Sequence, residues 1–176
     1  MDRIMVIGIS PGTGKSTFAR KLGQYLHINV YHLDVFYWKP NWIEASLEEF
    51  SNTQQNLVNQ CQWIIEGNYS STFEIRAERA DTIIYLELPL RVCLYRVVKR
   101  WLLNIGRTRT DMADGCKEKL DWDFIKFICT TYYPRKRIMN ERLQSLESKK
   151  EIVTLKSKQE IRNYLENIKM KKNDIE

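Results

Sequence analysis

A glycine-rich turn close to the N-terminus holds the residue types best suited to chemistry. It follows an apolar run over residues 4–9, precedes an amphipathic helical pattern, and consists of Gly12-Thr13-Gly14-Lys15-Ser16-Thr17. Glycines allow backbone N–H groups to surround an anion, a lysine at this spacing reaches the outer oxygens, and the serine hydroxyl can ligate Mg²⁺. The following helix adds the positive end of its dipole. The spacing predicts a phosphate-binding loop for ATP and Mg²⁺, with Lys15 in a catalytic role.

One position of this loop departs from the usual pattern. The pattern G-x-x-x-x-G-K-[ST] has a glycine where this chain has Ile9, and Gly8 comes one residue earlier. The remaining motif residues keep their register, so we expect the phosphate site to be retained. The first turn of the loop is expected to differ in detail.

Two residues at the end of the second apolar run, His32 and Asp34, are candidates for the site. A carboxylate at Asp34 could orient or deprotonate an acceptor hydroxyl, or hold Mg²⁺ through water. A solvated carboxylate at a strand end is the structural alternative. We expect His32 to support the edge of the core or a neighbouring site residue, and not to act as a base.

Glu66 ends the third apolar run and could hold the water shell of Mg²⁺ together with Ser16. The alternative is a capping or ion-paired glutamate close to Arg76 or Arg79. The neighbouring acids Asp81 and Glu87 are expected to be structural.

The segment between Arg91 and Arg109 contains no acidic residue, and its basic side chains are Arg91, Arg96, Lys99, Arg100, Arg107 and Arg109. Phosphoryl transfer spreads negative charge that guanidinium groups can stabilise. We expect Arg107 and Arg109, in a glycine-flanked loop, to act in catalysis from a lid, and Arg100 to contact the nucleotide. For the helical part, a solvated basic face is an equal alternative.

Two further groups have ordinary structural alternatives. The run Pro134 to Arg137 is expected to be surface charge, although it could contact phosphates or a nucleic acid backbone. The aromatic residues Tyr37, Trp38 and Trp42 could stack on a base or ring, or pack as a hydrophobic cap over the sheet.

The hydrophobic pattern alternates strands with helices along the whole chain. Strands are predicted over residues 4–9, 29–33, 63–67, 82–88 and 151–155, an irregular aromatic segment over 35–43, and a loop over 105–120. Ser46 and Glu49 form a capping box that opens a helix. This order predicts one three-layer α/β domain over residues 1–176, with a five-stranded, mostly parallel sheet. Ligands are then expected at the carboxyl ends of the strands.

Composition adds a charge asymmetry to this picture. Residues 1–88 carry 7 Lys and Arg against 10 Asp and Glu, and residues 89–176 carry 21 against 12. The second half is therefore basic, which suits a polyanionic partner such as a nucleotide or a nucleic acid. The four cysteines have no metal-ligand spacing, and no apolar run has the length of a membrane span or a secretory signal. We expect a cytoplasmic protein that does not enter the membrane.

Together these segments resemble the bacterial P-loop proteins labelled DNA topology modulation proteins, FlaR-related, which are similar to adenylate kinase and shikimate kinase. The segments that carry the resemblance are the phosphate loop, HLDVFYWKPNW, WIIEGNYSST, RADTIIYLELP and GRTRTDMADGCKEKLDW. The resemblance implies a nucleoside monophosphate kinase-like P-loop NTPase fold, ATP with Mg²⁺, and a LID segment at about 105–120 that contains Arg107 and Arg109. It also implies that Asp34 and Glu66-Gly67 lie in the acceptor site. The LID lacks a CxxC pair, so no zinc staple is expected.

The sequence thus favours an ATP-dependent phosphotransferase that acts on a small acceptor, such as a nucleoside, a nucleotide or another hydroxyl compound. The alternative is a DNA-associated ATP-binding protein that affects DNA topology. The basic second half and the family label favour this alternative, but the sequence contains no helix-turn-helix, zinc-finger or RNP pattern.

Overall fold

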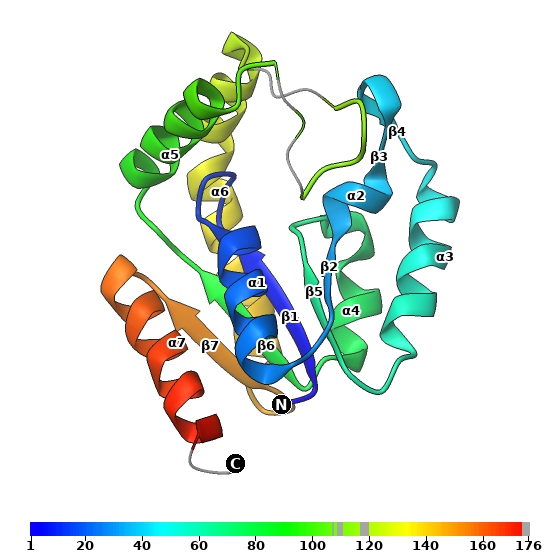
Figure 1. The fold of residues 1–176 in the computed structure, drawn as a ribbon, viewed down its shortest axis with the longest axis vertical. Helices are drawn as coiled ribbons and strands as arrows, with labels where there is room; N and C mark the ends of the chain where they lie inside the picture. Colours follow the sequence, from blue (N-terminus) through cyan, green and yellow to red (C-terminus); the bar gives the residue numbers. More distant parts are fainter. Residues whose placement is uncertain (107, 109–110, 117–119, 174–176) are drawn as a thin grey trace.

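The computed structural model describes residues 1–106, 108, 111–116 and 120–173 of the chain. Its centre is a five-stranded sheet in the order β2-β5-β1-β6-β7, and every pair of neighbouring strands is parallel (Figure 1). The strands are β1 Arg3–Gly8, β2 Val30–His32, β5 Trp63–Glu66, β6 Thr82–Leu86 and β7 Glu151–Leu155. The predicted five-stranded parallel sheet of an α/β domain is therefore confirmed.

The central strands are apolar on both faces because helices cover both sides of the sheet. In β1, Ile4 and Val6 face the layer that contains α1 and α7, whereas Met5 and Ile7 face the opposite layer. Figure 1 shows α1 and α7 side by side on one face of the sheet. The helices are α1 Lys15–Leu26, α2 Leu33–Tyr37, α3 Leu47–Val58, α4 Phe73–Arg79, α5 Leu90–Leu103, α6 Trp122–Leu146 and α7 Lys158–Asn173.

The predicted irregular segment over 35–43 contains more regular structure than its sequence indicates. After α2 comes a short antiparallel pair, β3 Trp38–Lys39 and β4 Ile43–Glu44, whose strands are joined by the 3₁₀ turn η1 Pro40–Trp42. A second 3₁₀ turn, η2 Ser70–Thr72, follows β5. Tyr37 packs against Phe50 and Tyr69 with ring centroids 5.0 and 4.6 Å apart. These aromatic contacts come from distant parts of the chain, so local sequence could not reveal them.

The other predicted elements agree with the structure within a few residues. The predicted helix start at Ser46 is confirmed, since the Ser46 hydroxyl accepts a hydrogen bond of 3.1 Å from the Glu49 backbone N–H at the start of α3. The Glu49 carboxylate, which would complete the capping box, accepts a 2.7 Å hydrogen bond from Lys39 Nζ. The helix α6 continues through Pro134. No helix in the described part of the chain is long and apolar enough to cross a membrane.

Candidate active site

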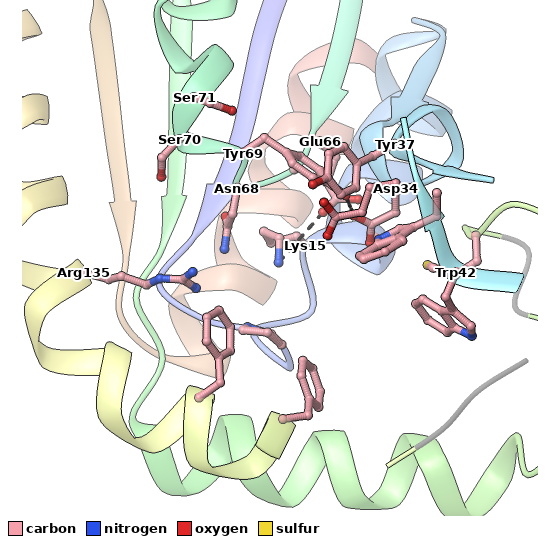
Figure 2. A pocket seen from close by; sticks show the side chains of 18 of the residues that line it. Lys15, Asp34, Tyr37, Trp42, Glu66, Asn68, Tyr69, Ser70, Ser71 and Arg135 are labelled. Carbon is pink, nitrogen blue, oxygen red and sulfur yellow. Dashed lines mark hydrogen bonds and ion pairs between the residues drawn. The ribbon is translucent and has the colours of Figure 1, made fainter. Parts of the chain in front are cut away.

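A cavity of about 800 Å³ opens at the carboxyl ends of the sheet strands, the edge where parallel α/β sheets bind ligands. Its size is in the range of small-molecule sites. Side chains from the phosphate loop, from α2 to β4, from the turn after β5, and from α5 and α6 line it together. Figure 2 shows Lys15 at its centre, with Arg135 on one side and Asp34, Tyr37 and Trp42 on the other.

The phosphate loop has the backbone geometry that its glycines predict. Gly12 and Gly14 adopt positive φ angles of 84° and 90°, which are unfavourable for residues with a Cβ atom. A Cβ on Gly12 would also lie 2.3 Å from the Cys93 carbonyl oxygen of α5. Both positions therefore require glycine.

The substitution of glycine by Ile9 has a structural explanation. Ile9 continues the first strand, because its N–H donates a 3.0 Å hydrogen bond to the Leu86 carbonyl oxygen, and its side chain is buried in the core. The close approach falls on Gly8 instead, where a Cβ would lie 2.4 Å from the Thr13 hydroxyl. The glycine required for close packing is therefore Gly8, one residue before the position in the usual pattern.

Helix α5 braces the phosphate loop from outside. The Arg96 guanidinium donates a 2.8 Å hydrogen bond to the Thr13 carbonyl oxygen. Among the basic residues of α5, Arg96 therefore contacts the loop backbone, and Arg100 lines the cavity.

Lys15, Glu66 and His32 form a chain of polar contacts at the floor of the cavity. The Lys15 Nζ lies 3.9 Å from Glu66 Oε1, and His32 Nδ1 lies 2.9 Å from Glu66 Oε2. Glu66 is buried, with 4% of its surface exposed. His32 thus lies behind Glu66, as expected for a residue that supports a neighbouring site residue.

Asp34 lies at the start of α2 and accepts a 2.6 Å hydrogen bond from the Tyr69 hydroxyl. Burial, together with the neighbouring Asp34 carboxylate, raises the pKa of Tyr69 far above its usual range. Tyr69 therefore stays protonated and remains a donor to Asp34. This contact fixes one face of the carboxylate at the cavity wall.

The turn after β5 is held by the buried side chain of Arg76. Arg76 is fully buried and donates hydrogen bonds of 2.8 Å to the carbonyl oxygens of both Gly67 and Tyr69. Burial lowers the pKa of Arg76 to about 9, and the nearby Glu66 carboxylate opposes this shift. An ion pair of Glu66 with Arg76 or Arg79, the predicted structural alternative, is not among the ion pairs of the described residues, in which Glu66 pairs with Lys15 and His32.

The prediction that the basic run of α6 is only surface charge is wrong for Arg135. This side chain lines the cavity and points toward Lys15 and Asn68 (Figure 2), and burial lowers its pKa. Arg135 lies three residues after the buried Tyr132 and seven after the buried Ile128. This helical spacing places Arg135 on the inward face of α6, and it is the signal that could have revealed its position. Its neighbour Lys136 instead pairs with Glu87 at 2.9 Å.

The other predicted site residues divide into three groups. Ser16 lines the cavity beside Lys15, while Thr13 is buried behind the loop and Thr17 is exposed on α1. Arg107 and Arg109 lie outside the described residues.

The cavity wall also includes aromatic residues of α6 that the sequence did not single out for the site, Phe124 and Phe127. Among the described residues no group of three His, Cys, Asp or Glu side chains is arranged to hold a metal ion.

No protein-family description and no curated protein matches this sequence. Solved structures do match its fold. A shikimate kinase from Bacteroides thetaiotaomicron gives a TM-score of 0.59 at 14% identity, over 96% of this chain and 97% of that one. A shikimate kinase from Acinetobacter baumannii in complex with shikimate gives 0.55 at 14% identity, over 96% and 90%. A gluconokinase from Sinorhizobium meliloti gives 0.54 at 12% identity, over 99% and 93%. The chain therefore has the fold of P-loop kinases.

Proposed function

We propose that the protein is an ATP-dependent phosphotransferase that acts on a small acceptor with a hydroxyl group. The observation that carries this proposal is the shared cavity, in which Lys15 of the phosphate loop faces Asp34 and the aromatic residues of the α2 to β4 segment. One end of the cavity suits a phosphate chain, and the other suits an acceptor.

The phosphate loop fits ATP and Mg²⁺. Its two glycines with positive φ let the backbone curl toward an anion at the first turn of α1, and Lys15 and Ser16 line the cavity there. Ser16 would ligate Mg²⁺, and Glu66 would hold a water molecule of its shell. The metal would supply charge neutralisation at the phosphate oxygens.

In the proposed reaction the acceptor oxygen forms a bond to the terminal phosphorus of ATP, and the bond from that phosphorus to the bridging oxygen breaks. Asp34 would orient the acceptor hydroxyl and accept its proton, because a carboxylate held by Tyr69 is already in a fixed orientation. Lys15 would bind the transferred group, and Arg100 the nucleotide. Arg107 and Arg109 would close over it from the proposed LID of the single 1–176 domain.

The acceptor is proposed to be a small molecule, and the solved structures support this choice. One matching structure is described as a shikimate kinase in complex with shikimate and another as a gluconokinase, both of which are kinases of small molecules. Membership of the topology modulation family remains a proposal that rests on sequence resemblance. No comparison favours a nucleic-acid partner.

The proposal is tested by replacing Lys15. We expect Lys15→Ala to weaken ATP binding by about tenfold or more and to reduce turnover further, because the variant loses a charge-assisted contact to the transferred group. The matched control is Lys21→Ala, an exposed lysine on the same helix. ADP release should be measured with nucleosides, nucleoside monophosphates and small hydroxy acids as acceptors. Turnover by Lys15→Ala at the parent rate would disprove the assignment.

A DNA titration across salt concentrations separates the alternative function. Nonspecific phosphate attraction falls steeply with salt, whereas a specific DNA site keeps its affinity at physiological salt. Retained DNA affinity, combined with the lack of any acceptor that stimulates ADP release, would favour the DNA-associated protein.

A further inference from the structure

A second, smaller recess lies behind the phosphate loop. It has a volume of about 70 Å³, enough for roughly two water molecules or one small polyatomic group. Its walls come from the start of the phosphate loop, the turn after β5, the end of β6 and one face of α6. Asn68, Ser70 and Arg135 line both this recess and the main cavity, so the two spaces adjoin.

The polar side chains that line the recess can all donate hydrogen bonds. Arg135 and Arg142 lie seven residues apart on α6 and both line it, which places two guanidinium groups on the same side. Within the described part of the chain, neither guanidinium forms an ion pair with a carboxylate. Each instead packs on an aromatic ring, Arg135 on Phe127 and Arg142 on Phe73, at 4.6 and 5.1 Å from the ring centres.

The amide and hydroxyl groups add to this donor set. The Asn68 Oδ1 accepts a 2.9 Å hydrogen bond from the Gly8 N–H, so its NH₂ group remains to donate elsewhere. Tyr85 of β6 also lines the recess, and its buried hydroxyl has no hydrogen-bond partner among the described residues. A buried hydroxyl without a partner is unfavourable unless a ligand or water satisfies it.

We propose that this recess is an oxyanion subsite, which binds a carboxylate or phosphate group by donors from Arg135, Arg142 and Tyr85. An oxyanion has only acceptor oxygens and carries negative charge, so it matches a pocket that offers donors and positive charge. Because the recess adjoins the main cavity, an acceptor molecule can place its acidic group there and its hydroxyl close to Lys15. This assignment to the acceptor rests on the proposed function, whereas anion binding itself does not. Free inorganic phosphate is the other source of the same chemistry.

The first experiment measures inorganic phosphate binding by calorimetry, without ATP. We expect Tyr85→Phe and Arg142→Gln each to weaken phosphate binding by about ten- to a hundredfold, the usual cost of losing one hydrogen bond to a charged group. The control Arg137→Gln removes an exposed arginine of the same helix that pairs with Glu141, and it should leave the affinity unchanged. Lys15→Ala should also retain this binding, because Lys15 does not line the recess.

The thermal unfolding midpoint of each variant, measured without phosphate, shows whether a loss of binding comes from misfolding. Tyr85→Phe removes only a hydroxyl that has no hydrogen-bond partner in the described part of the chain, so its thermal midpoint should stay equal to that of the parent or rise. Phosphate binding that disappears in Lys15→Ala but persists in Tyr85→Phe and Arg142→Gln would place the anion at the phosphate loop and overturn the subsite. Undetectable phosphate binding by the parent would overturn it too.

The second experiment distinguishes the two sources of the anion by comparing hydroxy acids with their neutral amides in the ADP-release assay. If the recess holds the acidic group of the acceptor, the parent should prefer the acid, and Arg142→Gln should raise the KM for the acid with little change in the KM for ATP. Equal use of acid and amide, combined with phosphate binding in the recess, would assign the subsite to free phosphate. Phosphate binding without turnover of any acceptor would leave the subsite standing and count against the proposed phosphotransferase.

Discussion

The two ends of the main cavity are built in different ways. The phosphate-loop region, residues 8–16 and the facing side of α5, is held by glycines at contacts that leave no room for a Cβ, together with the hydrogen bond from Arg96 to the loop backbone. The acceptor wall, residues 33–44 and 67–71, consists of short elements held by side chains, including the ring contacts of Tyr37 and the hydrogen bonds of Arg76. Backbone packing fixes one geometry, whereas a wall of side chains can change with few substitutions.

This difference matches the ligands proposed for the two ends of the cavity. The phosphate chain of a nucleotide is the same for every P-loop kinase, so a geometry fixed by glycines suits it. Acceptors differ, and a wall made from aromatic and polar side chains on short elements can adapt to them. The two regions should therefore respond differently to mutation.

The largest expected effect is on the acceptor wall, from Arg76→Met. The variant keeps much of the side-chain volume but leaves the carbonyl oxygens of Gly67 and Tyr69 without their buried donor. We expect a loss of about 3 kcal/mol in unfolding free energy, since each unsatisfied buried acceptor costs about 1–3 kcal/mol. Denaturant unfolding measures this loss.

The matched control for Arg76 is Arg79→Met on the same helix. Arg79 is exposed and donates one 2.8 Å hydrogen bond to Asn59, so this change should cost less than about 0.5 kcal/mol. Equal losses in the two variants would show that the buried arginine does not hold the wall.

The phosphate-loop region is tested by Gly12→Ala. A Cβ there meets both a positive φ of 84° and the Cys93 carbonyl oxygen at 2.3 Å. We expect a stability loss of about 2–3 kcal/mol and a large loss of ATP affinity, because left-handed backbone alone costs roughly 1–2 kcal/mol and the clash adds to it. Unfolding and nucleotide binding should be measured on the same samples.

Gly106→Ala separates the conformational cost from the clash. Gly106 has a positive φ of 71°, and no atom of the described residues lies within 4 Å of its Cβ position. This control should cost only about 1 kcal/mol in unfolding free energy. If Gly12→Ala costs no more than Gly106→Ala, the packing of α5 against the loop is not what fixes the phosphate-loop region.

The same division explains what the sequence could predict. The phosphate loop, the five strands and the layer order follow from local patterns, namely a glycine spacing and buried apolar runs, because these encode backbone geometry directly. The reason for Ile9 in place of a glycine could not be predicted in this way. Ile9 extends the strand by a hydrogen bond to Leu86, which is distant in sequence.

The acceptor wall was harder to predict because its contacts join distant segments. Asp34 and Glu66 could be proposed from their strand-end positions, but the Tyr69 hydroxyl on Asp34 and the Arg76 donors on the turn depend on tertiary packing. Arg135 was missed since a run of basic residues suggests solvent, although its spacing from Ile128 and Tyr132 indicates the buried face of α6.

A smaller effect is expected from Tyr69→Phe, which removes one hydrogen bond of 2.6 Å to Asp34 from the acceptor wall. We expect the KM for the acceptor to rise about tenfold, equivalent to ~1.4 kcal/mol, with an unchanged KM for ATP. Steady-state kinetics with each substrate varied in turn provides the measurement. An equal rise in both KM values would mean that Tyr69 supports the whole cavity and not one wall.

The smallest effect is expected at Asp81, which lies at the opposite edge of the sheet from both regions. Its carboxylate accepts hydrogen bonds of 3.0 and 2.8 Å from the backbone N–H groups of Asp2 and Arg3. Burial acts to raise the pKa of Asp81, but these two hydrogen bonds outweigh it with help from Thr82, and the pKa is lower than usual. The ionised carboxylate therefore contributes stability above pH 3.8, its ordinary value, and this contribution disappears as the pH falls through the lower folded pKa.

Asp81→Asn should consequently lower the unfolding free energy by about 1 kcal/mol at pH 7 and by less at pH 3, with unchanged kinetics for both substrates. Urea unfolding at the two pH values measures this difference, and Glu166→Gln, an exposed position on α7, serves as the control. A change in KM for either substrate would contradict the idea that the site is built only from the carboxyl edge of the sheet. It would show that hydrogen bonds at the amino edge, through β1, also determine the position of the phosphate loop.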